Sequence, residues 1–217
     1  MALKRTATAQ DTSANSTVEY ENLAEGEHEG RLVYIADLGL QSVEYKGEKK
    51  PDTQQIALGI EIVGNSVLID GQEKPRFLWT KPINIYYTLT ERGKEYEYYK
   101  IFNPTCQEGE VADWDAVLGT PCNVIVKHNT SNGRTYDNIA SLSAIPAKYH
   151  DGVAPARITD MAVGDADDDN NPAQKAMFGI PRATHARRLD PRRLNPPKVA
   201  TAKAPDSAVD FDDAIPF

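Results

Sequence analysis

The chain has 217 residues, of which 40% are hydrophobic, and its formal net charge is −8. It contains no apolar run of about eighteen residues and no apolar segment behind the basic residues near its start, so we expect neither a membrane span nor a signal peptide. Its two cysteines and four scattered histidines form no disulfide framework or zinc set. This pattern predicts no metal, no cofactor and a reducing, cytoplasmic compartment.

Charge is distributed unevenly along the chain. Residues 165–169 carry −4, residues 171–204 hold eight basic residues against one Asp, and residues 205–217 carry −4, which leaves −7 on residues 1–163. Nucleic-acid phosphates require nearby cations. An acidic folded part can therefore bind DNA only if its Lys and Arg side chains gather on one face.

The first third of the chain predicts a disordered arm followed by two strands. Residues 1–22 are rich in Thr, Ala, Ser and Asn without any period, which is typical of disorder. Residues 28–46 predict a long strand that bends at Gly39, because glycine lacks the Cβ that resists a sharp bend. Residues 54–63 alternate apolar and polar side chains, which predicts a half-buried strand. Its buried face consists of Ile56, Leu58, Ile60 and Ile62.

The middle of the chain predicts a third strand and one or two short helices. Residues 76–88 form a β-rich run that Pro82 interrupts. Residues 91–103 fit a helix and an alternating strand nearly equally well. Further on, Asp113 can cap a helix of about two turns that ends at Gly119.

The last predicted strands form a hairpin. Residues 122–128 and 134–145 flank an Asn-Gly pair, which readily adopts the positive φ angles of a tight hairpin turn. Roughly five strands with a helix between the third and the fourth is the element order of an OB-fold. We therefore expect a mainly β chain with a five-stranded OB-type barrel over residues 23–149, although other small barrels stay open.

Beyond this domain we expect a disordered C-terminal tail. Residues 150–204 are dominated by Pro, Ala, Asp and Arg, which predicts a linker with acidic and then basic segments. In residues 205–217, aspartates lead into an apolar end that bears the free carboxylate. Such an end can fill a pocket on a partner while its acidic groups steer it to a basic rim, and a plain acidic tail is the alternative. The residues predicted to bind partner proteins are Asp210, Phe211, Asp212, Asp213, Ile215, Pro216 and Phe217.

This ending resembles the acidic tip of bacterial single-stranded DNA-binding proteins, in which an Asp-rich stretch runs into Ile-Pro-Phe, although Ala214 stands where an acidic residue is usual. Within residues 26–147, the motifs LVYIADLGLQ, DWDAVLGTPCNVIVKH and YDNIASLSAIP look like the barrel of phage-encoded single-stranded DNA-binding proteins. The resemblance implies an OB-fold that acts in replication, recombination or repair in the cytoplasm of an infected bacterium. It also implies phage or host partner proteins at the tip, and homo-oligomerisation stays open.

Binding of single-stranded DNA without sequence specificity requires cations for the phosphates and aromatic rings for the bases. Both types interleave in the third strand, where Phe77 and Trp79 share a side, although these rings fit the core equally well. Both types also occur in the two loops that close over oligonucleotides in OB-folds, and a solvated charged loop is the alternative for residues 46–50. The residues predicted to bind DNA are Tyr45, Lys46, Lys49, Lys50, Phe77, Trp79, Lys81, Tyr87, Lys127, Arg134 and Tyr136.

Other functions stay open at this point. The sequence has no P-loop, HExxH or GxSxG motif, so we expect no enzyme, and we interpret Asp165–Asp169 as a spacer rather than a nuclease metal site. A strand-annealing recombination protein would also hold single strands. An adaptor that does not touch DNA is compatible with the acidic residues 1–163. The basic block Arg187–Arg193 either contacts DNA or holds the acidic tip in two further hypotheses.

Overall fold

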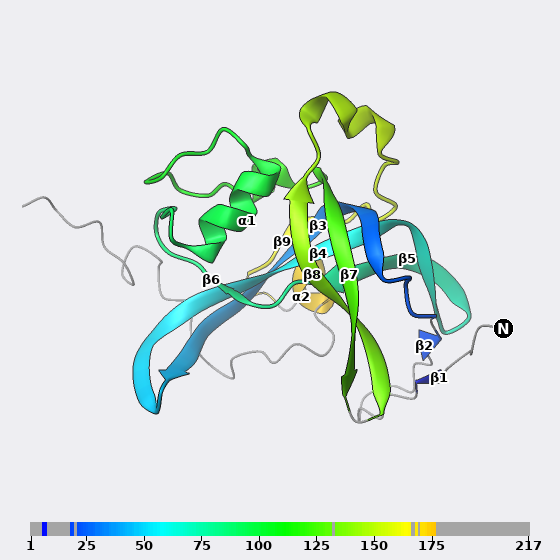
Figure 1. The fold of residues 1–217 in the computed structure, drawn as a ribbon, viewed down its shortest axis with the longest axis horizontal. Coiled ribbons are helices and arrows are strands. Elements are labelled where there is room, and N and C mark those ends of the chain that lie inside the picture. Colours follow the sequence, from blue (N-terminus) through cyan, green and yellow to red (C-terminus); the bar gives the residue numbers. More distant parts are fainter. Residues whose placement is uncertain are drawn as a thin grey trace, which may run out of the picture.

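The computed structural model describes residues 6–7, 18–19, 21–131, 133–165, 168 and 170–176 (Figure 1). Its strands are β1 (Thr6–Ala7), β2 (Val18–Glu19), β3 (Gly26–Tyr45), β4 (Glu48–Ile69), β5 (Gln72–Trp79), β6 (Ile83–Asn84), β7 (Pro121–Ser131), β8 (Arg134–Ala144) and β9 (Ala162–Val163). Its helices are α1 (Lys94–Phe102), α2 (Pro172–Ala176) and two 3-10 helices, Asp115–Val117 and Ala147–Gly152. The predicted partner-binding tip lies outside the described residues. No helix in the described part is long and apolar enough to cross a membrane.

The strands form one sheet in the order β1-β2-β4-β3-β7-β8, with β5 and β6 paired to β4 and β9 paired to β3. The pairing is antiparallel except between β3 and β9. Among the described residues no ladder joins β5 to β8, so the sheet is not a closed barrel. The prediction of a mainly β chain with short helices is confirmed, but the five-stranded OB-type barrel is not, because the sheet is open and has nine described strands. Several of the additional strands have only two residues, which is too short to leave an alternating pattern in the sequence.

Two hairpins extend from the sheet. β3 bends at Gly39 as predicted, where φ is +67° and the register with β4 shifts. The β3–β4 turn has positive φ at both Lys46 (54°) and Gly47 (79°), as a two-residue type I′ turn requires. The β7–β8 hairpin turns with Gly133 at φ +72°. Both predicted hairpin loops are therefore present.

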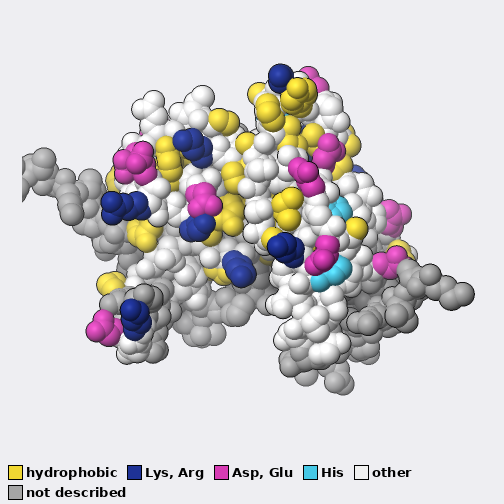
Figure 2. Space-filling view, in the orientation of Figure 1, with side chains coloured by type: hydrophobic (Ala, Val, Ile, Leu, Met, Phe, Trp, Pro, Cys, Tyr) yellow, Lys and Arg dark blue, Asp and Glu magenta, His cyan; other side chains and the backbone are white. Residues whose placement is uncertain are grey.

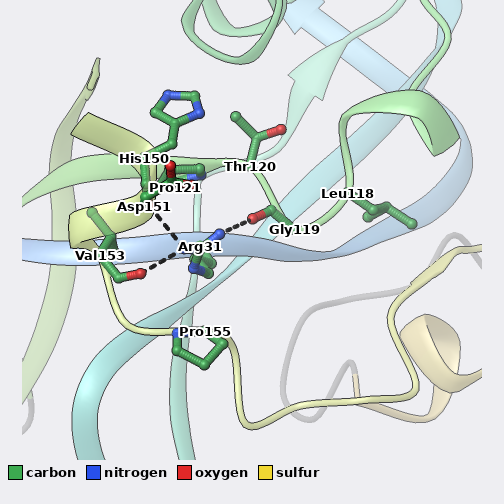
Figure 3. A pocket seen from close by; sticks show the side chains of 9 residues that line it. All are labelled: Arg31, Leu118, Gly119, Thr120, Pro121, His150, Asp151, Val153 and Pro155. Carbon is green, nitrogen blue, oxygen red and sulfur yellow. Dashed lines mark hydrogen bonds between the residues drawn. The ribbon is translucent and has the colours of Figure 1, made fainter. Parts of the chain in front are cut away.

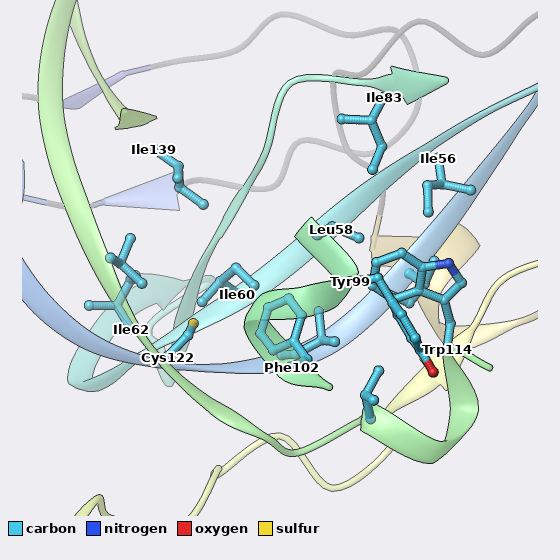
Figure 4. Close-up of a cluster of buried hydrophobic side chains, with 14 of the residues drawn as sticks. Ile56, Leu58, Ile60, Ile62, Ile83, Tyr99, Phe102, Trp114, Cys122 and Ile139 are labelled. Carbon is cyan, nitrogen blue, oxygen red and sulfur yellow. The ribbon is translucent and has the colours of Figure 1, made fainter. Parts of the chain in front are cut away.

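The main hydrophobic core lies on one face of the sheet (Figure 4). The predicted apolar face of β4 points into it, with all four side chains buried. Residues 91–103, which fitted a helix or a strand, contain α1, and α1 covers the core with Tyr99 and Phe102. The rings of Tyr99 and Trp114 meet edge to face with centroids 5.0 Å apart.

The helix predicted after Asp113 is shorter than expected. It is a 3-10 helix of three residues, Asp115–Val117, rather than an α-helix of two turns. As predicted, the Asp113 carboxylate accepts the N–H of Ala116 (3.2 Å), and the chain leaves the helix through Gly119 at φ +80°. The helix stays short because the next residues join β7 directly, where Leu32 donates to the carbonyl of Thr120 (3.1 Å).

The opposite face of β4 is buried too, which differs from the predicted half-buried strand. Ala57 and Glu61 are 0% and 1% exposed, respectively. The described residues of 153–176, named the strap here, contact this outer face of β3 and β4: β9 and α2 lie against β3, and Arg157 and Ile158 reach β4 (Figure 1). The sequence analysis assigned these residues to the linker, so the folded part extends past the predicted boundary at residue 149 to residue 176.

The strap is attached to the sheet by hydrogen bonds as well as apolar contacts. The buried Glu61 carboxylate accepts the backbone N–H groups of Arg157 (2.9 Å) and Ile158 (3.0 Å). The Gln174 amide exchanges two bonds with the backbone of Asp37 (3.0 and 2.9 Å). A Cβ added at Gly164 would lie 2.9 Å from the carbonyl oxygen of Ile35, so only glycine allows this close approach.

Candidate nucleic-acid interface

The β3–β4 and β7–β8 hairpins flank one side of the molecule, with β6 between them (Figure 1). β6 is held there by pairing with β4, and the Gln55 side chain donates to Asn84 Oδ1 (2.7 Å). We name the surface bounded by the two hairpin tips and crossed by residues 81–87 the hairpin face. This face is separate from the strap, which lies on the outer face of β3 and β4.

The tip of the β3–β4 hairpin gathers four of the predicted DNA-binding residues. Tyr45 ends β3, Lys46 is exposed in the turn, and Lys49 and Lys50 follow among the first residues of β4. The type I′ turn fixes their backbone register, because a two-residue loop leaves no freedom for a slip. Of these four, Lys46 has a described side chain, which is exposed at the turn.

The β7–β8 hairpin places a lysine and a tyrosine on one face. Lys127 of β7 pairs with Asn138 of β8. Two residues closer to the turn on each strand, Asn129 pairs with Tyr136. Residues paired across an antiparallel ladder share a face, and so do residues two apart. Lys127 is exposed and Tyr136 is 40% exposed. Arg134 is the first residue of β8, at the tip of the same hairpin.

A buried ion pair anchors the base of this hairpin. Arg76 of β5 pairs with Asp137 of β8, both side chains are almost fully buried, and Arg76 also donates to the carbonyl of Glu21 (2.8 Å). The Asp137 carboxylate accepts the N–H of Leu23 (3.0 Å). This pair crosses the open seam between β5 and β8. Arg76 is therefore a structural cation and not a phosphate contact.

Residues 81–87 cross the hairpin face between the two hairpins. Of the predicted residues, Lys81 is exposed and Tyr87 is half-buried. Tyr86 is 36% exposed and was not among the predicted DNA-binding residues. The dense tyrosines of residues 86–99 indicate that some of their rings face outward, but they do not show which ones.

The structure places Phe77 and Trp79 elsewhere, on the outer face. As predicted, they share the side of β5 opposite Arg76. Both rings are half-buried and pack with Tyr34, with centroid distances of 5.6 Å from Tyr34 to Phe77 and 6.3 Å from Tyr34 to Trp79. Sequence reasoning missed Tyr34, which follows a register shift in β3 that aims it outward.

This aromatic cluster lies beneath the strap, against buried Ile158 and Ala173. The Tyr34 hydroxyl donates to the Asp160 carboxylate (2.9 Å), and burial raises its pKa well above the usual value. The cluster thus belongs to a second hydrophobic core and is not brought together with the hairpin tips.

Charge on the hairpin face is mixed. Figure 2 shows Lys and Arg side chains across the middle of this view, between the hairpins and over α1, with Asp and Glu side chains interspersed among them. Lys81 and Lys127 are both exposed. DNA binding on this face therefore depends on individual exposed cations rather than on a continuous basic patch.

A shallow depression of about 530 Å³ is formed near Arg31 and the start of the strap (Figure 3). The Arg31 guanidinium donates to the carbonyl groups of Gly119 (2.6 Å), Val153 (2.7 Å) and Ala154 (2.8 Å). Because its donors point at backbone oxygens, Arg31 tethers the strap to β3 and is unsuited to an anionic ligand.

The described residues contain no group of three or more His, Cys, Asp or Glu side chains that could hold a metal ion. Burial raises the pKa of the Cys122 thiol to about 12, so it stays protonated and unreactive at neutral pH. The other cysteine, Cys106, is buried as well.

No family model, curated protein or solved structure matches this chain. The function must therefore be inferred from the placement of its own residues.

Proposed function

We propose that the chain binds single-stranded DNA without sequence specificity across the hairpin face and protects it during phage DNA replication, recombination or repair. The observation that carries this proposal is the placement of exposed Lys127 and Tyr136 on one hairpin, with a basic tip on the other hairpin and residues 81–87 between them. Cations for phosphates and rings for bases are the two components of sequence-independent strand binding.

The strand order supports an OB-type relationship. β3, β4, β5, α1, β7 and β8 follow one another as the elements of an OB-fold do, and β7 lies beside β3. The sheet then corresponds to an OB-type barrel opened between its third and fifth strands. In OB-folds, the two loops that correspond to these hairpin tips close over oligonucleotides.

The outer face is an unsuitable path for DNA. It is covered by the strap, and beneath the strap lie the carboxylates of Glu61 and Asp37, which would repel phosphates. The hairpin face carries the strand in this proposal, and Phe77 and Trp79 contribute to folding.

The C-terminal tip completes the proposal on the basis of its sequence. Asp210–Phe217 recruits phage or host replication and recombination proteins through its apolar end and acidic charge. The chain then acts as a cytoplasmic strand protector and recruiter, not as an enzyme.

The direct test is fluorescence anisotropy with a labelled oligo-dT of about thirty nucleotides and its duplex, over a salt series. We expect salt-sensitive binding to the single strand only, retained after truncation behind Pro205. The double variant Lys127→Gln/Tyr136→Ala is expected to lower affinity at least about tenfold, with the melting temperature unchanged.

A matched control is available at the other end of the molecule. Lys148 and Tyr149 are also an exposed Lys-Tyr pair, with Nζ 4.7 Å from the ring centroid, but they belong to the 3-10 helix Ala147–Gly152 (Figure 1). Lys148→Gln/Tyr149→Ala should bind as the wild type does. Equal losses in both double variants would contradict the assignment to the hairpin face.

The acidic charge of residues 1–163 favours an adaptor as the second candidate function. Absence of oligonucleotide binding at low salt would support the adaptor and overturn the main proposal. Accelerated pairing of complementary oligonucleotides would instead identify a strand-annealing protein.

A further inference from the structure

Helix α1 and the segment before it present a second group of rings and cations. Tyr86 is 36% exposed, and the half-buried Tyr96 ring has the Lys100 ammonium 5.4 Å from its centroid. Tyr96 and Lys100 are one helical turn apart, so they share a face of α1. The lysine and the ring thus form a combined cation and aromatic contact at the surface.

The backbone that carries Tyr86 is held in place from two sides. The Tyr86 N–H donates to the buried Glu95 carboxylate (3.0 Å), and the N–H of the preceding Ile85 donates to the carbonyl of Gln54 in β4 (2.9 Å). A ring on a fixed backbone loses less conformational entropy when a base stacks on it. Tyr86 is therefore arranged like a binding residue and not like a mobile loop side chain.

This surface continues the hairpin face. α1 packs against both β6 and β8, and it lies next to β6 in Figure 1. A strand that crosses residues 81–87 between the hairpins would meet Tyr86 and then the exposed side of α1. In Figure 2, both dark blue and magenta side chains lie over the region of α1.

We propose that Tyr96 and Lys100, which follow Tyr86 at the edge of the hairpin face, form a second contact for single-stranded DNA, which extends the bound strand beyond that face. This inference rests on the proposed function and adds the α1 surface to it. A nucleic acid is the ligand of choice because the surface combines ring faces with a cation. An acidic peptide would require only the cation.

The test exploits strand length. A short oligo-dT of about eight nucleotides fits one contact region, and one of about thirty reaches both. The variant Lys100→Gln should lower affinity for the long strand about fivefold at about 0.1 M salt and affinity for the short strand less than about twofold. The slope of log affinity against log salt should fall by about 0.7 for the long strand, because one phosphate contact is lost.

A control variant lies on the same helix. Lys94 is paired with Glu97 (2.6 Å), so Lys94→Gln removes the same charge from α1 without touching the proposed contact. It should leave both affinities unchanged, and the melting temperatures of all variants should match that of the wild type.

The outcomes distinguish a failure of the second contact from a failure of the proposed function, single-strand binding. If the wild type binds neither oligonucleotide, the proposed function fails. If it binds both and the α1 variant loses no affinity for the long strand, only the second contact is refuted. A loss of equal size on both lengths would refute it as well, because these residues would then belong to the first contact region.

Discussion

Aromatic and charged residues occur on both the outer face and the hairpin face. On the outer face they pack into the fold, and on the hairpin face they are exposed to solvent. On the outer face, the rings of Tyr34, Phe77 and Trp79 pack on one another and the Glu61 carboxylate is satisfied by backbone N–H groups of the strap. On the hairpin face, Tyr136 lies exposed beside Lys127. In this chain, an aromatic residue in a strand is therefore a candidate for DNA binding only where the ring and its polar neighbours are exposed to solvent.

The two faces can be compared by measuring how substitutions on each face change the free energy of unfolding and the affinity for DNA. Substitutions on the outer face should lower the free energy of unfolding and spare DNA affinity, whereas substitutions on the hairpin face should do the reverse. The four expectations that follow run from the largest effect on stability to the smallest.

Removal of the Glu61 carboxylate, which holds the strap, should give the largest loss in the free energy of unfolding. Glu61→Ala leaves the N–H groups of Arg157 and Ile158 without their acceptor in a buried site, so we expect a loss of about 3 kcal/mol in the free energy of unfolding. Urea denaturation measures it. Glu27→Ala, which removes an exposed carboxylate from β3 away from the strap, is the control and should behave like the wild type. Equal stabilities of the two variants would show that Glu61 does not hold the strap.

The aromatic cluster should come next. Trp79→Ala removes a half-buried ring from contact with Tyr34 and Phe77, and we expect the free energy of unfolding to fall by about 2 kcal/mol. Oligo-dT affinity should stay within about twofold of the wild type. Weakened binding at unchanged stability would instead return Trp79 to the DNA-binding residues.

Glu95 is buried in α1 and accepts the N–H of Tyr86 on the hairpin face. Its contribution to the free energy of unfolding depends on pH. Burial raises the pKa of Glu95 from 4.5 to about 7. The folded chain holds this proton more tightly than the unfolded chain, so the stabilisation is complete below about pH 4.5 and is lost as the pH rises through about 7.

Glu95→Gln keeps an acceptor for Tyr86 but cannot ionise. We expect it to be more stable than the wild type by about 1 kcal/mol at pH 8, and the difference should shrink toward pH 5. Urea titrations across this pH range measure the trend. A difference that does not change with pH would show that Glu95 does not titrate in the folded chain.

The smallest effect on stability is expected at Tyr136. Tyr136→Ala should change the free energy of unfolding by less than about 0.5 kcal/mol, yet it should weaken oligo-dT binding about tenfold. Tyr136→Phe keeps the ring and should bind almost normally. Equal binding by the Phe and Ala variants would exclude stacking at this position.

Local patterns in the sequence predicted much of the fold. The alternation from Ile56 to Ile62 identified the core face of β4, and Gly39 and Gly133 marked a bend and a turn, because each signal lies within a few residues. The burial of Glu61 was not predictable in this way. Its partners are 96 and 97 residues away, in a segment whose Pro- and Asp-rich composition is typical of a linker.

Only part of the candidate site was predictable, again because the sequence shows local signals and not long-range contacts. The basic and aromatic composition of the hairpin tips was visible, since Lys46 and Tyr136 stand beside recognisable turns. Whether Phe77 faced solvent depended on the strap, and the exposure of Tyr86 depended on a bond to Glu95 in a later helix. Both are tertiary relationships without a local pattern.

The distance along the chain between Glu61 and the strap also bears on synthesis. At roughly 5–20 residues per second, the 96 residues from Glu61 to Arg157 correspond to about 5–20 s of translation. During that interval the nascent chain carries the rings of Phe77 and Trp79 without their cover. We infer that this domain completes its folding only as residue 176 leaves the ribosome, and that shorter nascent chains are the form most exposed to chaperones and to aggregation.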